Sequence, residues 1–178
     1  MSSTVMLFSR SKTEVREQDD FYATPPEVTQ LFLNNFKEVH RINNIWEPAC
    51  GNGDMSKVLE DNLFSVRSSD LIDRGYGDIV DFLKESAPFN GSIMTNPPYK
   101  LGKEFLQKAL DLIPNDQYVI FLLRIQFLES KTRRKLLESH LHSIYVHSER
   151  IGCAKQGDFS KPIVRGMTYC WFVFRKKN

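Results

Sequence analysis

The chain has 178 residues, 41% of them hydrophobic and 26% charged, and this size and composition predict one globular domain with a buried core. No apolar run is long enough to span a membrane. The three cysteines form no Cys-x-x-Cys pair, no signal-like stretch opens the chain, and the four histidines lack zinc-ligand spacing. We therefore expect a cytoplasmic protein without a disulfide framework, a membrane anchor or a metal.

Charge is distributed unevenly along the chain, although the net charge is only +2. Residues 1–99 hold 9 Lys/Arg and 15 Asp/Glu, whereas residues 100–178 hold 15 and 7, so the two parts carry −6 and +8. An acidic half suits a cofactor site, and a basic half suits a phosphate backbone. Both surpluses are also compatible with solvated helix faces.

The folded part is expected to begin near residue 19. Residues 1–18 are polar and show little periodicity, which predicts a flexible segment, and residues 19–178 are expected to form a single domain. Thr24 is a candidate N-cap for a helix that has prolines in its first turn and runs to about Asn35.

A glycine loop follows the first predicted strand, residues 42–46. Its sequence is Glu47-Pro48-Ala49-Cys50-Gly51-Asn52-Gly53, and a helix with Leu63 on its inner face is expected to begin near Met55. The two glycines allow the backbone to approach a ligand closely. Ser56 departs from the Gly-x-Gly-x-x-Gly fingerprint of dinucleotide enzymes. Glu47 either contacts the ligand or braces the loop by accepting its amides.

An acidic side chain ends the second predicted strand, residues 64–71. Nucleotide-binding sheets place an acidic ribose ligand at this position, which favours Asp70. Asp73 is either a competitor for this role or a turn cap. Residues 78–83 then lead into Asp81 and Phe82, and a phenylalanine here is compatible with a place in the core.

The stretch Thr95-Asn96-Pro97-Pro98-Tyr99 follows another apolar strand. Two consecutive prolines end the strand and remove two amide donors, which leaves the Asn96 side chain and the Pro97 carbonyl at its end. Two acceptors can take both N–H bonds of a conjugated amine and free its lone pair, while the Tyr99 ring stacks on the base. A purely structural role, with Asn96 capping a turn and Tyr99 covering an edge, is the alternative.

The remaining elements complete an alternation of strands and helices. We expect a helix from residue 101 to 113, a central strand over 117–123, a helix that opens with the basic run 131–135 and ends near His140, and final strands over 144–146 and 169–174. This pattern predicts an α/β fold with a doubly wound, mostly parallel sheet. A loop rather than a helix joins the last two strands, so one strand near the C-terminus is expected to be antiparallel.

Basic residues of the second half are candidates for phosphate contacts in a nucleic acid. The alternatives are a solvated helix face for the basic run and a mobile hairpin tip for residues 149–166. The candidates are Lys100, Lys131, Arg133, Arg134, Arg150, Lys155, Lys161 and Arg165.

Three motifs together resemble those of a known enzyme class. The glycine loop and Asn96-Pro97-Pro98-Tyr99 resemble the paired motifs of class I S-adenosylmethionine-dependent amino-methyltransferases, and residues 20–26 resemble the motif that such enzymes place first. Over most of its length the chain is similar to phage-type DNA N6-adenine methyltransferases. Larger relatives with this motif order carry a separate target-recognition domain, for which 178 residues leave no room.

The resemblance implies a Rossmann-like methyltransferase sheet that binds S-adenosyl-L-methionine. It implies methyl transfer to the N6 amine of a flipped adenine in DNA, with Asn96, Pro97 and Tyr99 as catalytic residues. Adenine in structured RNA, a glutamine amide of a protein, and a non-catalytic binding module remain alternatives, and neither the recognition sequence nor the oligomeric state follows from the sequence. The implied cofactor residues are Tyr22, Thr24, Glu47, Ala49, Gly51, Gly53, Asp70, Asp81, Phe82 and Asn96.

Overall fold

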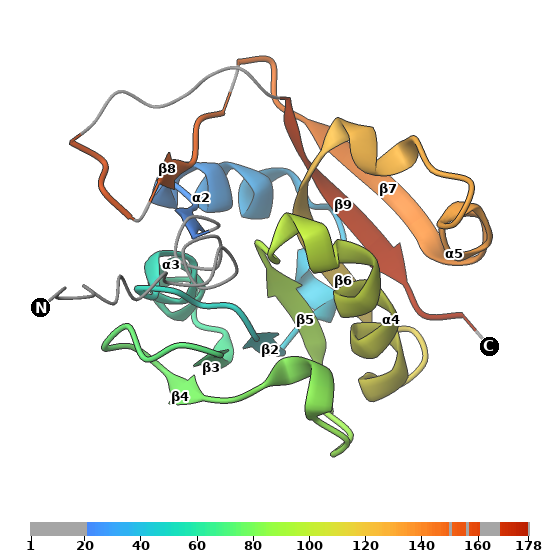
Figure 1. Ribbon diagram of the computed structural model, residues 1–178, viewed down its shortest axis with the longest axis horizontal. Helices are drawn as coiled ribbons and strands as arrows, with labels where there is room; N and C mark the ends of the chain where they lie inside the picture. Colours follow the sequence, from blue (N-terminus) through green and yellow to red (C-terminus); the bar gives the residue numbers. More distant parts are fainter. Residues whose placement is uncertain (1–20, 150, 156, 161–167, 178) are drawn as a thin grey trace, which may run out of the picture.

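The computed structural model describes residues 21–149, 151–155, 157–160 and 168–177 (Figure 1). The segment expected to be flexible, residues 1–18, lies outside the described residues. Seven strands form one sheet in the order β4-β3-β2-β5-β6-β9-β7, and β1 pairs with β8 in a separate two-stranded ribbon. The strands are β1 (Tyr22–Ala23), β2 (Asn44–Glu47), β3 (Ser65–Asp70), β4 (Asp78–Ile79), β5 (Ser92–Thr95), β6 (Tyr118–Arg124), β7 (Leu141–Val146), β8 (Ala154–Lys155) and β9 (Tyr169–Arg175).

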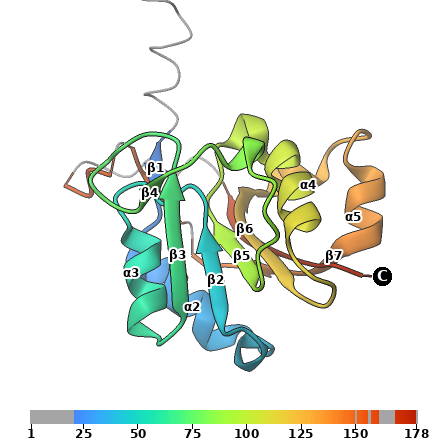
Figure 2. The same cartoon turned by 90° about the horizontal axis from the view of Figure 1, so that it is seen from below.

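The sheet is parallel except at β9. Parallel pairs join β4, β3, β2, β5 and β6, whereas β9 runs antiparallel to both β6 and β7. This arrangement confirms the expected doubly wound sheet with an antiparallel strand near the C-terminus. Because the parallel strands share one direction, their carboxyl ends meet at one edge of the sheet (Figure 2).

Helices cover both faces of the sheet (Figure 1). Alternate side chains of β6 point to opposite faces: Ile120 packs in the core under α2 and α3, and Phe121 packs in the core under α4. Burial on both faces explains why this strand is continuously apolar. The helices are α2 (Pro26–Asn35), α3 (Asp54–Asp61), α4 (Gly102–Leu112) and α5 (Arg134–His140), with 3-10 turns η1 (Val39–Arg41), η2 (Phe82–Lys84), η3 (Tyr99–Leu101) and η4 (Ile125–Leu128).

Two local expectations are wrong. Leu63 does not face the core: it lies beyond the end of α3 with φ 65, and 93% of it is exposed. Thr24 does not cap α2, whose N-cap is Pro25 and has no side-chain cap bond. The Thr24 hydroxyl instead accepts a hydrogen bond from Asn96, 72 residues further along the chain.

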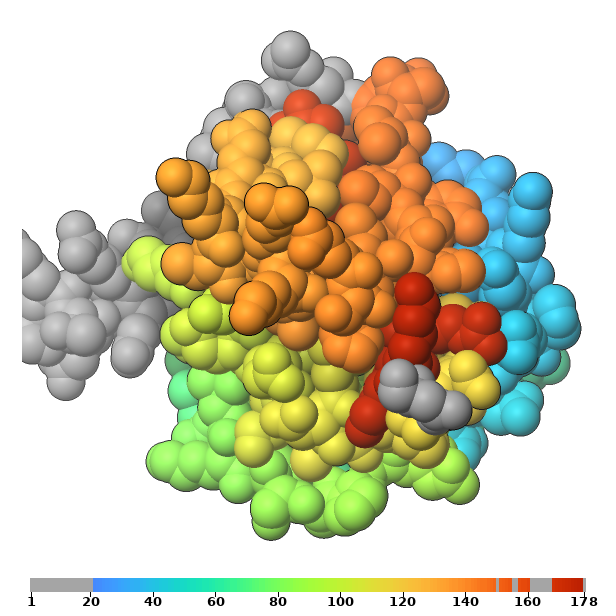
Figure 3. Space-filling view, turned by 90° about the vertical axis from the view of Figure 1, so that its right-hand side faces the viewer, coloured from blue at the N-terminus to red at the C-terminus, as the bar shows by residue number. Residues whose placement is uncertain are grey.

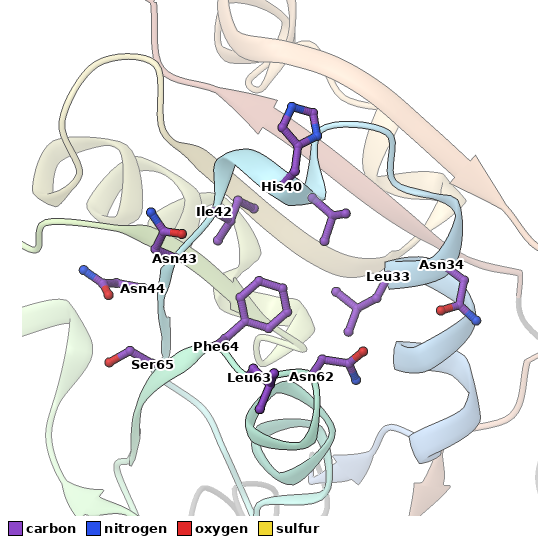
Figure 4. A pocket seen from close by; sticks show the side chains of 11 residues that line it. Leu33, Asn34, His40, Ile42, Asn43, Asn44, Asn62, Leu63, Phe64 and Ser65 are labelled. Carbon is purple, nitrogen blue, oxygen red and sulfur yellow. The ribbon is translucent and has the colours of Figure 1, made fainter.

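An open hollow of about 700 Å³ lies at the amino end of the parallel strands, where β2 and β3 begin (Figure 4). Asn44 and Ser65, the first residues of these strands, line it. Ligands of doubly wound sheets bind outside the carboxyl ends of the strands, so this hollow is on the wrong side for the expected site. Within the described part of the chain, no helix combines the length and the apolar character needed to cross a membrane.

Candidate active site

Functional side chains converge at the carboxyl edge of the sheet. Glu47 ends β2, Asp70 ends β3, Asn96 directly follows β5, and Arg124 ends β6. These four strands are neighbours in the order β3-β2-β5-β6, so residues that are distant in sequence share one edge (Figure 2). This is the position at which doubly wound sheets bind nucleotides.

The amide of Asn96 has a fixed orientation. Its Nδ2 donates to the Tyr22 carbonyl oxygen at 2.8 Å and to Thr24 Oγ1 at 3.2 Å. A backbone carbonyl can only accept, so the nitrogen must face Tyr22 and the oxygen must point elsewhere. Asn96 Oδ1 is buried and has no hydrogen-bond partner among the described residues. The described residues also provide no donor to the Pro97 carbonyl. Two unused acceptors therefore stand at the end of β5, as the sequence predicted.

The Tyr99 ring is packed within an aromatic cluster. Its centroid lies 6.0 Å from that of Tyr22 and 5.6 Å from that of Tyr169, both at tilted angles. The guanidinium carbon of Arg124 lies 4.5 Å from the Tyr99 centroid, over the ring. Burial raises the pKa of the Tyr99 hydroxyl well above its usual 10, so this group stays protonated at neutral pH.

Arg124 is a site residue that the sequence analysis did not single out. It covers one face of the Tyr99 ring, so a base that stacked on this face would have to displace it. The sequence shows only that Arg124 directly follows the apolar run expected as the central strand, and the structure adds that this strand neighbours the one that precedes Asn96. Its importance could be recognised only once these two strands were known to be adjacent.

The glycine loop and the acid of β3 meet as expected. Gly51 and Gly53 have φ of 55 and 80, a left-handed conformation that favours glycine. The Gly51 amide donates to Asp70 Oδ2 at 2.9 Å, and the Ile72 amide donates to Asp70 Oδ1 at 3.0 Å. The competing acid, Asp73, accepts from the Gly75 amide at 2.9 Å, which is the turn-cap alternative.

Two aromatic rings lie against the glycine loop. A Cβ at position 51 would lie 2.1 Å from Cε2 of Phe21, and a Cβ at position 53 would lie 2.4 Å from Cδ1 of Tyr76. The Arg74 guanidinium stacks on the Phe21 ring at 4.2 Å. No role for these two rings was expected from the sequence. A ligand that approaches both glycines must displace them.

Glu47 is a buried acid that is hydrogen-bonded to the start of α3. Only 2% of the residue is exposed, and its Oε2 accepts a hydrogen bond from Ser56 Oγ, which in turn lies 2.6 Å from Ser68 Oγ. Burial raises the pKa of Glu47 well above its usual 4.5, although the hydrogen bonds from Ser56 oppose the shift. Among the described residues no cation pairs with this carboxylate. It is therefore held by the first turn of α3 and not by amides of the loop, and its contact with a ligand remains a prediction.

Asp81 and Phe82 both make structural contacts, and the cofactor contacts that the resemblance implied for them remain a prediction. Asp81 accepts from the Leu83 amide at 3.2 Å and pairs with Lys84 at 3.0 Å, and the hydrogen bond from Lys84 lowers the pKa of Asp81. Phe82 is 2% exposed, and its ring packs against Trp46 at 5.2 Å. Phe82 is thus a core residue, as one alternative held, and its ring also packs against Phe105 at 5.0 Å. Ala49 is half-buried beside the glycine loop, where it was expected.

The candidate residues for phosphate contacts differ in their exposure and in the hydrogen bonds and ion pairs that they already make. Lys100, Lys131 and Arg134 are exposed, and Arg134 pairs with Glu138 at 2.7 Å. Arg133 is instead tied to η4: its Nε donates to the Phe127 carbonyl at 2.8 Å. Figure 3 shows α5 and the segment before it, in orange, on an open face of the molecule. Of the other candidates, Arg150, Lys161 and Arg165 lie outside the described residues, and for Lys155 only the backbone pairing with Tyr22 is described.

Comparison of the sequence with protein-family models and with curated protein sequences finds no match. The structure is similar to a proposed RNA methyltransferase from Pyrococcus horikoshii, with a TM-score of 0.66 and 15% identity, covering 90% of this chain and 89% of the other. A proposed class I S-adenosylmethionine-dependent methyltransferase from Listeria monocytogenes gives 0.62 and 13%, covering 88% and 61%. The N-methyltransferase NodS from Bradyrhizobium japonicum, solved with S-adenosyl-L-homocysteine, gives 0.57 and 13%, covering 85% and 87%.

These similarities identify the fold. The chain has the Rossmann-like fold of class I S-adenosylmethionine-dependent methyltransferases, with a seven-stranded, mostly parallel sheet and antiparallel pairing at the C-terminal strand. The structural relatives act on different substrates, so the fold leaves the substrate open. The similarity to phage-type DNA N6-adenine methyltransferases remains a prediction.

Proposed function

We propose that the protein is an S-adenosylmethionine-dependent methyltransferase that modifies the N6 amine of adenine in DNA. The observation that carries the proposal is the amide of Asn96. Its nitrogen is held by Tyr22 and Thr24, while its oxygen is buried without a partner among the described residues. An unpaired buried acceptor costs about 1–3 kcal/mol, and an amine donor from a substrate would relieve this penalty.

The residues around the glycine loop fit the cofactor. The buried Glu47 carboxylate, which lacks a cation partner among the described residues, suits the methionyl ammonium group, and Asp70 suits the ribose hydroxyls. The backbone of Gly51 and Gly53 would lie against the methionine portion once the Phe21 and Tyr76 rings have moved. When bound, the cofactor supplies an electrophilic methyl group, whose bond to sulfur breaks as the substrate nitrogen forms the new N–C bond.

The chain's own groups then prepare the substrate amine. Asn96 Oδ1 and the Pro97 carbonyl accept its two N–H bonds, so the nitrogen lone pair is no longer delocalised into the ring. The Tyr99 ring stacks on the flipped base and holds it in plane. No strong base is required of the protein, because the nitrogen becomes acidic only after it has gained the methyl group and can then release a proton to water.

Nucleoside mass spectrometry tests this function directly. The parent protein and Asn96→Ala are incubated with a labelled methyl donor and with unmethylated DNA, structured RNA or a peptide containing glutamine. We expect labelled N6-methyladenine from the DNA with the parent and at least a hundredfold less with the variant. Label in the peptide alone, or no transfer to any acceptor, would overturn the proposal.

Adenine in structured RNA is a second candidate substrate. The observation that favours it is the similarity to a proposed RNA methyltransferase, which extends over 90% of this chain. An adenine amine offers the same two N–H bonds to Asn96 and Pro97 in either nucleic acid. Label in RNA but not in DNA would replace the first proposal with this one.

A further inference from the structure

We propose that Arg124 binds a phosphate of the target nucleotide and that, before substrate arrives, its guanidinium group covers the face of Tyr99 on which the target base stacks. This inference rests on the proposed function, because it names a residue that positions the substrate of that reaction. It assigns a role to a residue that neither the motifs nor the basic run at residues 131–135 include.

The position of Arg124 links it to the reacting end of the sheet. It ends β6, which pairs with β5, and Asn96 directly follows β5. Its guanidinium carbon lies over the Tyr99 ring at 4.5 Å from the centroid, a distance at which a cation is attracted to an aromatic face. Any base that stacks on this face must take the place of the guanidinium group.

Arg124 has no anionic partner among the described residues, and in this it resembles Arg74 over Phe21 and Arg133 over Phe127. Two other arginines of the chain do have such a partner. Arg67 stacks on Trp46 at 3.9 Å and pairs with Glu85 at 3.4 Å, and Arg175 pairs with Asp116 at 2.8 Å. Among the described residues no carboxylate pairs with Arg124, and its Nε is buried without a hydrogen-bond partner. The guanidinium group thus has unused donors and an uncompensated charge beside the catalytic residues.

The chemistry of the proposed reaction argues that this charge belongs on a phosphate. An amine that receives a methyl group from a sulfonium donor becomes positively charged, so a guanidinium group that remained beside it would oppose the reaction. A planar guanidinium group matches the oxygens of a phosphate and binds them in a bidentate manner. Movement of Arg124 from the ring to a phosphate would therefore expose the stacking face and remove the cation from the reacting nitrogen.

The test is a thermodynamic cycle that combines a substitution of Arg124 with the neutralisation of a single phosphate in the DNA. Mass spectrometry first locates the adenine that the parent methylates in this DNA. Methylphosphonate, which is neutral, replaces the linkage on the 5′ or the 3′ side of that adenine. We expect Arg124→Gln and one of these replacements each to weaken binding, measured with S-adenosylhomocysteine present, by about tenfold, and the two together to weaken it by no more than either alone. The slope of log affinity against log salt should also fall by about 1.

Two further variants separate phosphate binding from packing. Arg124→Lys keeps the charge, so its plot of log affinity against log salt should have a slope close to that of the parent. If Arg124 served only in packing, Arg124→Gln would also leave this slope unchanged. Arg67→Gln removes a stacked arginine elsewhere and should retain the full methylphosphonate effect. If the loss of affinity caused by Arg124→Gln simply adds to the loss caused by each methylphosphonate, Arg124 does not bind either phosphate. This outcome would overturn the role of Arg124 but not the proposed function. A parent that methylates no nucleic acid would overturn the proposed function and this inference together.

Discussion

At the scale of single residues, the site depends on Asn96 more than on any other side chain. Its two donors are used to hold Tyr22 and Thr24, and its acceptor is left free. Asn96 therefore differs from a residue that only caps a turn, because the side-chain oxygen of a turn cap accepts a hydrogen bond from the local backbone. The structure therefore gives the asparagine a supporting role and leaves one atom for chemistry.

Asn96→Ala is expected to separate these two roles. Loss of the acceptor should lower the single-turnover rate of methyl transfer by about a hundredfold or more. Loss of the two hydrogen bonds to Tyr22 and Thr24 should lower the free energy of unfolding by about 1–2 kcal/mol. Thr24→Val removes one of these bonds but keeps the acceptor, so its rate should fall far less. Equal rates for the parent and Asn96→Ala would show that the acceptor is not used.

Glu47 provides a prediction about pH. Because its pKa is raised in the folded state, the folded protein holds a proton that the unfolded chain releases, so this group destabilises the fold as pH rises above about 4.5. Glu47→Gln keeps an acceptor for Ser56 but cannot ionise. Without cofactor, the variant should unfold at a higher temperature than the parent at pH 8, and the difference should shrink towards pH 4.5.

The same substitution, Glu47→Gln, should weaken binding of the cofactor. The buried Glu47 carboxylate and the methionyl ammonium group of the cofactor attract each other through their opposite charges. A neutral Gln side chain lacks this attraction. Calorimetric affinity for S-adenosylhomocysteine should fall by about tenfold or more in Glu47→Gln. A variant that melts below the parent at pH 8 and binds cofactor equally well would show that Glu47 serves only to hold the start of α3.

At the scale of elements, the glycine loop and the loop after β3 act as one unit. Gly53 and Gly75 both have φ near 80, but a Cβ at Gly53 would meet the Tyr76 ring, whereas a Cβ at Gly75 would meet nothing within 4 Å. The pair separates the effect of backbone strain from that of a close contact. Alanine at either position should destabilise the protein by about 1 kcal/mol through strain.

Gly53→Ala is therefore expected to destabilise the protein more than Gly75→Ala. The additional loss measures how tightly the Tyr76 ring, which donates through its hydroxyl to Glu60 Oε1 at 2.9 Å, is held against the loop. Chemical denaturation of the two variants gives this difference. Equal stabilities would mean that the ring moves aside freely, as a cofactor would require of it.

The segment that leads into α5 provides the electrostatic prediction. Lys131 and Arg134 are exposed, whereas Arg133 is bound to the backbone of η4, so Lys131 and Arg134 are the better pair for a test of phosphate binding. Neutralising Lys131 and Arg134 together should flatten the plot of log DNA affinity against log salt by about 2. Lys37 and Arg41, which are exposed near the amino edge of the sheet, provide the matched control, and their neutralisation should leave the slope unchanged. If both pairs change the slope equally, the attraction is non-specific.

At the scale of the whole molecule, the sheet order explains how distant motifs become one site. The strands that end at Glu47, Asp70, Asn96 and Arg124 are neighbours, and β1 reaches across to Asn96 from the N-terminal side of the chain. The helices fill both faces of the sheet and leave its carboxyl edge for ligands. The hollow at the opposite edge has none of these groups in its lining.

The sequence by itself predicted the main strands and helices in their order, although not the β1–β8 ribbon, and it placed Asn96 and the Pro97 carbonyl at the end of a strand. Strand periodicity, helix periodicity and the two prolines are local properties, so they are legible without the fold. The place of Asp70 at the end of a strand was also predicted from the sequence alone, whereas its contact with a ribose remains a prediction. These features need no knowledge of which segments touch.

Only the tertiary structure decided which way Asn96 faces, that Phe82 is buried, and that Arg124 covers Tyr99. Asn96 is oriented by residues 72 and 74 positions away, and Phe82 of η2 is buried against Trp46 of β2. Arg124 meets Tyr99 only because β5 and β6 are adjacent. Each of these facts depends on contacts between segments that sequence spacing does not relate, since packing of the sheet and its helices, rather than local backbone preference, brings those segments together.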